Sequence, residues 1–517
     1  MMKKAIIIHP LLFAVYPILF LYSHNLGEAA FQDTLIPFAI TVGFTMSAWV
    51  VLGLVLKNWK KSGIIVSLFL VLFFSYGYFR TPLKCKELVL LMSSVWILLF
   101  IFGSFYTAKS KKDFTTATMV LNVVACILIV LPMINIAIYL FGNSGKFGHN
   151  NNSMVLQTDL QSTIKEQSYP DIYFIILDAY AREDILREIY DYDNSEFLNF
   201  LRQKGFYIAD RSFSNYCQTG LSIGSCFNLS YLDWLVKQIG QDCKDREPLE
   251  EIIKNSFVIT YLRKHGYKIV AFSSDRFEVD LDNADVYLKP EKSVNLFDNA
   301  VMNMTPLPDI MVARKKYNEF DKFRQKILFT LDNLGKVAGT FQSPKFVFAH
   351  VEIPHPPFVF GPNGEPRNTE IRLYDHDGSD LIRPGRLSLE EYRRYYIDQI
   401  IFINGRMQKV INEILDSSKR PPIIMILGDH GPRSMTDWEN MEKTNVHECM
   451  SNLNAYYLPE NGDKLLYPEI TMVNSFRVIL HHYFGESCAL LPDKSYFSND
   501  LYPYKFYDVT EKVQGQH

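Results

Sequence analysis

The first part of the chain consists of long apolar runs separated by short polar segments. A membrane-spanning helix needs about 20 mostly apolar residues, because lipid offers no hydrogen-bond partner to an exposed backbone amide. The pattern therefore predicts a bundle of five transmembrane helices over residues 1–141, and the third run is the shortest. The predicted spans are Ala5–Leu21, Leu35–Leu56, Ile64–Phe79, Leu88–Phe105 and Ala117–Phe141.

The pattern changes after a polar segment, residues 142–168, which we interpret as a linker. From residue 169 to residue 517, short β-rich apolar runs alternate with helical segments. This alternation is typical of an α/β domain whose mixed, mostly parallel central sheet lies between helices. The predicted strands are Asp171–Leu177, Lys268–Phe272, Lys345–His350, Ile423–Leu427 and Asn454–Leu458. The clearest predicted helices are Ser195–Lys204, Glu250–His265 and Leu389–Leu415.

Charge divides the chain at the same place. Residues 1–141 have a net charge of +7, whereas the rest has −10 and no long basic tract, which argues against a nucleic-acid-binding protein.

Lys and Arg favour the cytoplasmic ends of spans, and their distribution places the N-terminus inside. With five spans, everything after residue 142 then lies outside the cytoplasm. The inner segments contain Lys3, Lys4, Lys57, Lys60, Lys61, Lys109, Lys111 and Lys112, and the outer ones Arg80, Lys84, Lys86 and Lys146.

Metal-ligating residue types follow three of the predicted strands. Asp178 follows the first strand, Asp429 and His430 follow Ile423–Leu427, and His350 ends the strand that begins at Lys345. In open α/β sheets, ligands bind where loops leave the carboxyl ends of the strands. Carboxylate oxygens and imidazole nitrogens together suit a divalent cation. The sequence thus predicts a cation site at this edge of the sheet.

A candidate nucleophile lies in the loop that begins at Cys217, which enters a predicted helix. Thr219 would place a hydroxyl at the helix N-terminus, where free backbone amides favour developing negative charge on a phosphate or sulfate ester. A neighbouring cation would make that hydroxyl a better nucleophile at neutral pH. The alternatives are that Thr219 only caps the helix and that Ser222 takes its place.

Taken together, these motifs resemble the sulfatase and alkaline phosphatase superfamily over residues 170–485. The order of the two parts resembles membrane phosphoethanolamine transferases and lipoteichoic acid synthases. The matching pieces are Leu177-Asp178, Thr219-x-x-Ser222, Leu262 with Gly266-Tyr267, His350 with Pro354-His355-x-Pro357, and Gly428-Asp429-His430-Gly431.

The resemblance implies roles for individual residues. Asp178, Asp429 and His430 would bind one divalent metal together with the Thr219 oxygen, and the metal could be zinc, manganese or calcium. His355 would protonate a leaving oxygen or contact the anionic group of the substrate. The remaining candidates for substrate contact are His350, His447 and Ser222.

The sequence also departs from parts of this superfamily. Sulfatases that use formylglycine need Cys or Ser followed by x-Pro-x-Arg, and neither Cys217 nor Ser222 is followed by that pattern. No Asp-x-x-x-His pattern accompanies His350 and His355, so a second metal is not predicted. A further Asp/His cluster, Asp375-His376-Asp377, lies in a Gly- and Pro-rich segment, and we expect it to be a surface loop.

The resulting hypothesis is a multi-pass enzyme of the cytoplasmic membrane with its catalytic domain on the periplasmic or extracellular side. It would take a phosphate-type group from a phospholipid or other phosphoester donor and pass it to an envelope glycan or lipid. One alternative is a sulfuric or phosphoric ester hydrolase, in which water accepts the group. An alternative of another class is an inactive envelope protein that binds lipid or glycan.

Overall fold

The computed structural model describes residues 6–26, 31–80, 86–144, 169–290, 296–313, 319–367, 377–382 and 386–515. The chain forms two compact units. A helical unit comprises Met1–His149 and Val294–Asn318, and an α/β unit comprises Asn150–Ser293 and Glu319–His517. Residues 294–318 lie within the predicted 169–517 domain in sequence, but they group with the helical unit.

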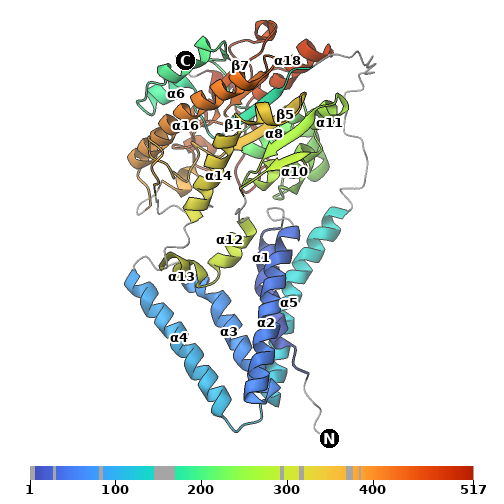
Figure 1. The fold of residues 1–517 in the computed structure, drawn as a ribbon, viewed down its shortest axis with the longest axis vertical. Helices are drawn as coiled ribbons and strands as arrows, with labels where there is room; N and C mark the ends of the chain where they lie inside the picture. The colour runs from blue at the N-terminus through green and yellow to red at the C-terminus, as the bar shows by residue number, and fades with distance from the viewer. Residues whose placement is uncertain are drawn as a thin grey trace. The chain divides into compact units, whose positions relative to one another are not determined.

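The helical unit contains long apolar helices that follow the predicted spans (Figure 1). Four helical stretches are long and apolar enough to cross a membrane, within the residues described: Phe31–Leu56, Trp59–Arg80, Glu87–Lys109 and Thr115–Tyr139. The run predicted as the shortest span is part of a 22-residue helix. The helices of this segment are α1 (His9–His24), α2 (Leu35–Leu56), α3 (Trp59–Arg80), α4 (Lys86–Lys109) and α5 (Thr115–Ser144).

Helix α1 is the element on which a count of five spans depends. It has 16 residues and would extend about 24 Å, less than the roughly 30 Å of a bilayer's hydrocarbon core. Phe13, Ala14 and Ile18 of α1 are buried in a core that also contains Val66 and Leu70 of α3. The fifth span, and with it the side of the membrane on which the α/β unit lies, stays a prediction.

Two short helices from the middle of the sequence complete the helical unit. They are α12 (Leu296–Asn303) and α13 (Leu307–Ala313). The backbone N–H of Gly77 in α3 donates to the carbonyl of Met304 at 2.9 Å. A Cβ atom at Gly77 would lie 2.0 Å from the carbonyl oxygen of Asn303, so only glycine permits this close approach.

The α/β unit is built on a seven-stranded sheet with strand order β2-β7-β6-β1-β5-β3-β4. Neighbouring strands from β6 to β4 are parallel, whereas β7 is antiparallel to both β6 and β2. The predicted mixed, mostly parallel sheet is therefore confirmed. The strands are β1 (Ile172–Leu177), β2 (Tyr207–Ile208), β3 (Lys268–Phe272), β4 (Val286–Leu288), β5 (Lys345–Val351), β6 (Ile423–Leu427) and β7 (Asn454–Tyr457).

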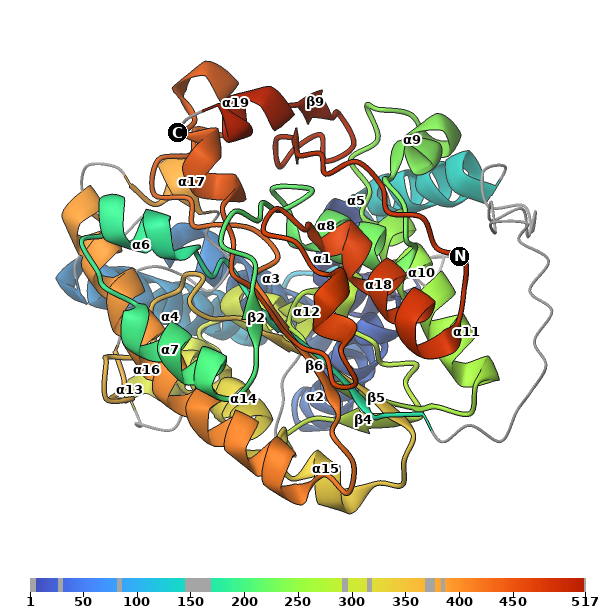
Figure 2. The same ribbon diagram turned by 90° about the horizontal axis from the view of Figure 1, so that it is seen from above.

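Helices cover both faces of the sheet, and Figure 2 shows the two groups on opposite sides of the strands. Alternate residues of β1 enter two different cores, because successive side chains of a strand point to opposite faces. The first face packs against α7 (Ser195–Gln203), α14 (Glu319–Asn333) and α16 (Leu389–Ser417). The second packs against α8 (Thr219–Phe227), α11 (Phe257–Lys264) and α18 (Met472–Phe484).

One predicted helix is wrong in its extent. Glu250–His265 forms two helices, α10 (Glu247–Lys254) and α11, because Ser256 adopts an extended backbone and its hydroxyl accepts the N–H of Ile259. A Ser N-cap of this kind starts a new helix instead of continuing the old one. The remaining elements are α6 (Glu183–Glu188), α9 (Asp233–Ile239), α15 (Val337–Thr340), α17 (Val446–Met450), α19 (Thr510–Gln514), β8 (Tyr496–Phe497) and β9 (Tyr507–Asp508).

Candidate metal centre

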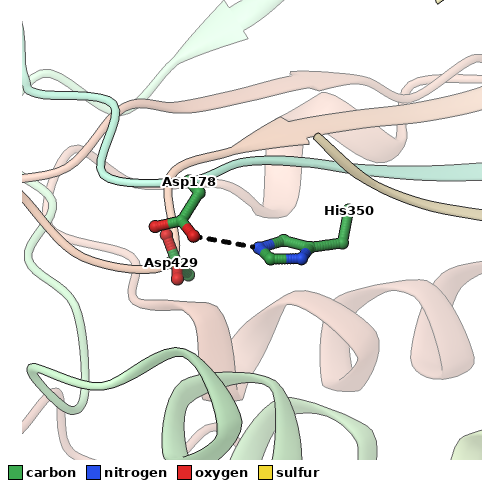
Figure 3. A group of neighbouring side chains, drawn as sticks. All are labelled: Asp178, His350 and Asp429. Carbon is green, nitrogen blue, oxygen red and sulfur yellow. Dashed lines mark ion pairs between the residues drawn. The ribbon is translucent and has the colours of Figure 1, made fainter. Parts of the chain in front are cut away.

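Three adjacent parallel strands bring the predicted ligands to one edge of the sheet. Asp178 follows β1, His350 lies in β5, and Asp429 and His430 follow β6. β1 lies between the other two strands, and Ile176 pairs with His350 on one side and with Leu427 on the other. Figure 3 shows the carboxylates of Asp178 and Asp429 close together and the His350 ring directed at Asp178.

Three oxygen–nitrogen pairs have the separation expected between neighbouring ligands of a small ion. Asp178 Oδ2 lies 3.4 Å from His350 Nε2, and Asp178 Oδ1 lies 3.3 Å from His430 Nε2. Asp429 Oδ2 also lies 3.3 Å from His430 Nε2. Ligands about 2.0–2.1 Å from a tetrahedral zinc ion are about 3.3–3.4 Å apart. One ligand atom each of Asp178, His350 and Asp429 lie within 4.8 Å of one another.

The same atoms lack hydrogen-bond partners within the described part of the chain. Asp178 Oδ1, His350 Nε2, Asp429 Oδ2 and His430 Nε2 are all buried and unpaired. Buried polar atoms are almost always satisfied, because leaving one unpaired costs about 1–3 kcal/mol, more for a charged group. Four such atoms directed at one another fit a bound cation, which would satisfy all of them.

Hydrogen bonds on the far side of each ligand fix its orientation. Nδ1 of His430 donates to the Gly431 carbonyl at 2.8 Å, so Nε2 can keep its lone pair. Nδ1 of His350 lies 2.9 Å from the Ser274 hydroxyl, and the N–H of Ala179 donates to Asp429 Oδ1 at 3.0 Å. Such outer contacts set the tautomer and aim of metal ligands in proteins.

The backbone around these ligands adopts conformations that few residues tolerate. Ala179, directly after Asp178, has φ of 61° and thereby directs its N–H at Asp429. A non-glycine residue in this left-handed region costs roughly 1–2 kcal/mol, which is typical of functional sites. Gly428 is required for a different reason, since a Cβ atom there would lie 2.6 Å from the Tyr180 carbonyl oxygen.

Electrostatics favours the metal-binding protonation states of His430 and Asp178, but not that of His350. Burial, reinforced by the nearby Arg433 guanidinium, lowers the pKa of His430 to about 4, so this imidazole is neutral at physiological pH. Burial raises the pKa of Asp178, but His355, His350 and His430 outweigh it and hold that pKa well below its usual range. Burial by itself would lower the pKa of His350, but the Asp178 carboxylate raises it by more. The pKa of His350 therefore lies above its usual value.

These shifts predict that metal affinity falls as the solution becomes acidic. Because its pKa is raised, His350 holds a proton at a higher pH than a free imidazole, and that proton must leave before Nε2 can bind a metal. We expect the apparent zinc Kd of the purified chain to rise at least tenfold between pH 8 and pH 6, measured with a competing chelator. His350→Gln should flatten this dependence, and an unchanged slope in that variant would contradict the assignment.

A buried network of charges behind His350 was not anticipated from the sequence. The Ser274 hydroxyl donates to Glu352 Oε1 at 3.1 Å, and Lys326 Nζ lies 2.8 Å from both Glu352 Oε2 and Asp275 Oδ1. Lys326 comes from α14, Glu352 follows β5, and Asp275 follows β3. The network thus joins three elements and holds the hydroxyl that orients His350.

Asp280 holds the backbone of Ser274 in place, but its buried carboxylate destabilises the folded chain when it is charged. Its carboxylate accepts the N–H of Ser274 at 2.9 Å and the hydroxyl of Tyr287 at 2.7 Å. Burial raises the pKa of Asp280 from 3.8 to about 6. Protonation of Asp280 therefore contributes to the free energy of unfolding in full below about pH 4. This contribution is lost as the pH rises through about 6, and the loss is on the order of 3 kcal/mol.

We therefore expect Asp280→Asn to raise the thermal unfolding midpoint at pH 8 and to leave it nearly unchanged at pH 4. Asn keeps an acceptor oxygen for Ser274 and carries no charge. Exposed Asp242 provides the matched control, since Asp242→Asn should shift the midpoint little at either pH. Equal effects of Asp280→Asn at both pH values would refute this explanation.

Thr219 is the first helical residue of α8, and it is buried. Gln218, with an extended backbone, occupies the N-cap position, so the alternative that Thr219 caps this helix is wrong.

Two arginines connect the start of α8 to the cluster. Arg433 donates to the Cys217 carbonyl, and its charge lowers the pKa of His430.

The second arginine is Arg276, which follows β3. Burial lowers its pKa, but the carboxylates of Asp178, Glu278 and Asp429 raise it more. Glu278 in turn lies against the first turn of α8, since a Cβ atom at Gly220 would be 2.8 Å from its Cγ. Both arginines are absent from the sequence-based site, because a single Arg in a loop has no distinguishing pattern.

His355 lies beside the cluster. Its N–H donates to the Asp178 carbonyl at 3.0 Å, and its Nδ1 donates to the Pro356 carbonyl at 2.6 Å. Its Nε2 lies 3.7 Å from Asp377 Oδ2 and 3.5 Å from Arg433 Nη1. His355 Nε2 therefore accepts a hydrogen bond from Arg433 and lies beside the Asp377 carboxylate.

Asp377 corrects one prediction, because it is buried instead of lying on a surface loop. The Tyr392 hydroxyl donates to its carboxylate at 3.0 Å, and the Trp438 indole donates to its carbonyl at 2.8 Å. The Gly- and Pro-rich composition indicated a loop, but it does not tell whether a loop is covered. Asp375 and His376 lie outside the described residues.

The three residues predicted to contact substrate have other surroundings. His350 joins the metal-ligand cluster itself. The Ser222 hydroxyl is buried and donates to the Tyr216 carbonyl at 3.0 Å. His447 lies in α17, with Nδ1 3.2 Å from the Val513 carbonyl and Nε2 3.7 Å from Asp184 Oδ2. None of these contacts of Ser222 and His447 involves a residue of the cluster.

A scan against known protein families and a search of curated proteins find no match. Among solved structures, the chain is similar to the C-terminal periplasmic domain of EcEptC from Escherichia coli in complex with Zn, with a TM-score of 0.44 and 10% identity over 66% of this chain and 93% of that one.

Two further structures extend the comparison. The integral membrane protein lipooligosaccharide phosphoethanolamine transferase A (EptA) from Neisseria meningitidis has a TM-score of 0.38 and 9% identity over 91% of this chain and 94% of that one. The putative sulfatase yidJ from Bacteroides fragilis has a TM-score of 0.37 and 12% identity over 63% of this chain and 76% of that one.

Proposed function

We propose that this chain is a membrane-anchored, metal-dependent enzyme that transfers or cleaves a phosphate-type ester through Thr219. The observation that supports it most is a group of two carboxylates and two imidazoles at the carboxyl ends of β1, β5 and β6. Four of its buried atoms lack hydrogen-bond partners within the described residues, and its carboxylate oxygens lie 3.3 Å or 3.4 Å from the imidazole nitrogens. An inactive lipid- or glycan-binding protein would have no need to bury two carboxylates face to face.

Asp178, His350, Asp429 and His430 would hold the metal. Their spacing and mixed nitrogen and oxygen donors favour zinc over calcium, which prefers 6–8 oxygen ligands at longer distances. When bound, the ion would supply Lewis-acid stabilisation of negative charge beside the Thr219 hydroxyl. In this proposal His350 moves from the predicted substrate contacts to the ligands Asp178, Asp429 and His430, and the Thr219 oxygen lies beside the ion.

In the first step, the Thr219 oxygen forms a bond to phosphorus while the bond from phosphorus to the donor's leaving oxygen breaks. His355 Nε2 accepts the threonine proton and delivers it to the leaving oxygen. Asp377, 3.7 Å from that nitrogen, stabilises the imidazolium formed in between. In the second step, an acceptor hydroxyl attacks phosphorus, its proton passes through His355, and the Thr219 oxygen leaves.

The anionic group of the substrate needs positive charge near the nucleophile. Arg276 and Arg433 supply it, since Arg433 donates to the Cys217 carbonyl, two residues before Thr219, and the carboxylates of Asp178 and Asp429 raise the pKa of Arg276. Planar guanidinium groups match the oxygens of a phosphate. This arrangement supports an anionic ester as the substrate.

The membrane-type helices support a lipid donor, because tethering beside a bilayer raises the local concentration of phospholipid headgroups. We propose an envelope glycan or lipid as acceptor and the cytoplasmic membrane as the location, with the site on the periplasmic or extracellular side. That side depends on α1 acting as a fifth span.

The decisive experiment uses the full chain in detergent with zinc and a phospholipid carrying a radiolabelled headgroup phosphate. We expect intact-mass analysis to show an adduct that maps to the peptide containing Thr219. Added glycan or lipid acceptors should then become labelled if the chain is a transferase, whereas release of free labelled headgroup alone indicates a hydrolase. A zinc-loaded protein that gives neither adduct nor turnover would refute the proposal.

A further inference from the structure

Residues 296–313 lie within the α/β unit in sequence but pack in the helical unit. In sequence they lie between β4 and α14 of the α/β unit, yet α12 buries its apolar side chains in the core of the helical unit. Phe297, Val301 and Met304 share that core with Phe13 of α1 and Phe74 of α3.

Polar contacts place α13 beside the ends of two membrane-type helices. Asp309 Oδ2 accepts the Tyr76 hydroxyl at 2.8 Å, and Asp309 Oδ1 lies 3.0 Å from Arg80 Nη2. Arg80 is the last residue of α3, and the Tyr76 hydroxyl also lies 2.8 Å from Ser93 of α4. Tyr and Arg at the end of a span are typical of the membrane–water interface.

α13 also exposes apolar side chains at this level. Leu307 and Ile310 are 38% and 45% exposed, and their spacing of three residues puts them on the same face of the helix. The adjoining ends of α3 and α4 expose apolar residues as well, with Phe79 at 56% and Leu88 at 47%. Leu307 and Ile310 therefore add exposed apolar side chains to a helix whose Asp309 is bound to the end of α3.

We propose that α12 and α13 form an interfacial membrane element, with Leu307 and Ile310 inserted at the boundary between lipid headgroups and acyl chains. The occupant of this surface is the bilayer itself. Short helices with an apolar face and a polar anchor bind membranes in this way.

The test uses the full chain in phosphatidylcholine vesicles, with a bimane fluorophore on Ile310→Cys. Leu465→Cys is the matched control, because Leu465 is a similarly exposed residue (37%) of the α/β unit. The parent chain is labelled in parallel, and the signal from its own cysteines is subtracted. Lipids with a nitroxide at acyl position 5 or 12 then report the depth of the fluorophore.

We expect Ile310→Cys to be quenched at least twofold more strongly than Leu465→Cys, and more by the position-5 lipid than by the position-12 lipid. Equal quenching at the two sites would overturn the proposal, as would protection from aqueous iodide without quenching by lipid, which indicates a protein partner. If Ile310→Cys unfolds at a lower temperature than the parent, Leu307→Cys provides the same measurement. None of these outcomes depends on catalysis.

Discussion

Asp429→Asn should abolish both metal retention and turnover while preserving the fold. Asn keeps the Oδ1 atom that accepts the Ala179 N–H at 3.0 Å, so the local backbone loses no hydrogen bond. The atom that changes is Oδ2, which faces His430 at 3.3 Å and becomes a neutral amide nitrogen without affinity for a cation. We expect less than a tenth of an equivalent of bound zinc and a loss of activity of about 10³-fold or more.

Elemental analysis after gel filtration measures the metal, and hydrolysis of a phosphodiester reporter measures activity. Asp416→Asn is the matched control, because Asp416 is an exposed carboxylate at the end of α16. Thermal unfolding in chelator provides a sharper comparison. Asp178 and Asp429 repel each other without a cation, so the metal-free Asp429→Asn variant should be at least as stable as the metal-free parent. Retention of a full equivalent of zinc by the variant would contradict the site.

Much of the site was predictable because its ligands follow strands that the apolar pattern identifies. β1 and β6 end within one residue of the predicted limits, and parallel pairing of neighbouring strands brings Asp178 to Asp429 and His430. His350 lies at the predicted strand end, and its closeness to Asp178 makes it a candidate ligand, a role that the sequence did not indicate. The sequence does not fix the register of β5 against β1, which sets the His350 ring against Asp178.

The residues that sequence reasoning missed lie in loops or depend on tertiary burial. Lys326 lies in a charged stretch of α14, and only packing reveals that it is buried between Asp275 and Glu352. Asp377 belongs to a segment with loop composition, and composition does not report depth. The apolar residues of α12 are too few to signal a separate element, so its place in the helical unit depends on tertiary packing.

Thr219→Ala should remove turnover without removing the metal, which separates the nucleophile from the ligands. Asp178, His350, Asp429 and His430 remain, so we expect close to one equivalent of zinc. Thr219 follows the N-cap residue of α8, so its loss removes no cap and should lower the unfolding midpoint by only a few degrees. We expect at least a 10³-fold loss of activity and no labelled phosphoryl adduct.

Two further variants, Thr219→Ser and Ser222→Ala, test whether the loss of activity in Thr219→Ala is the loss of the nucleophile. Serine keeps a hydroxyl at the same position, so Thr219→Ser should retain activity within about 10²-fold and carry the label on residue 219. Ser222→Ala loses only the hydrogen bond to the Tyr216 carbonyl, so it should still form the adduct on Thr219. An adduct that persists in Thr219→Ala and disappears in Ser222→Ala would transfer the nucleophilic role to Ser222. Undiminished turnover of both variants would mean that neither hydroxyl attacks phosphorus, and the covalent mechanism would have to be abandoned even if the metal site stands.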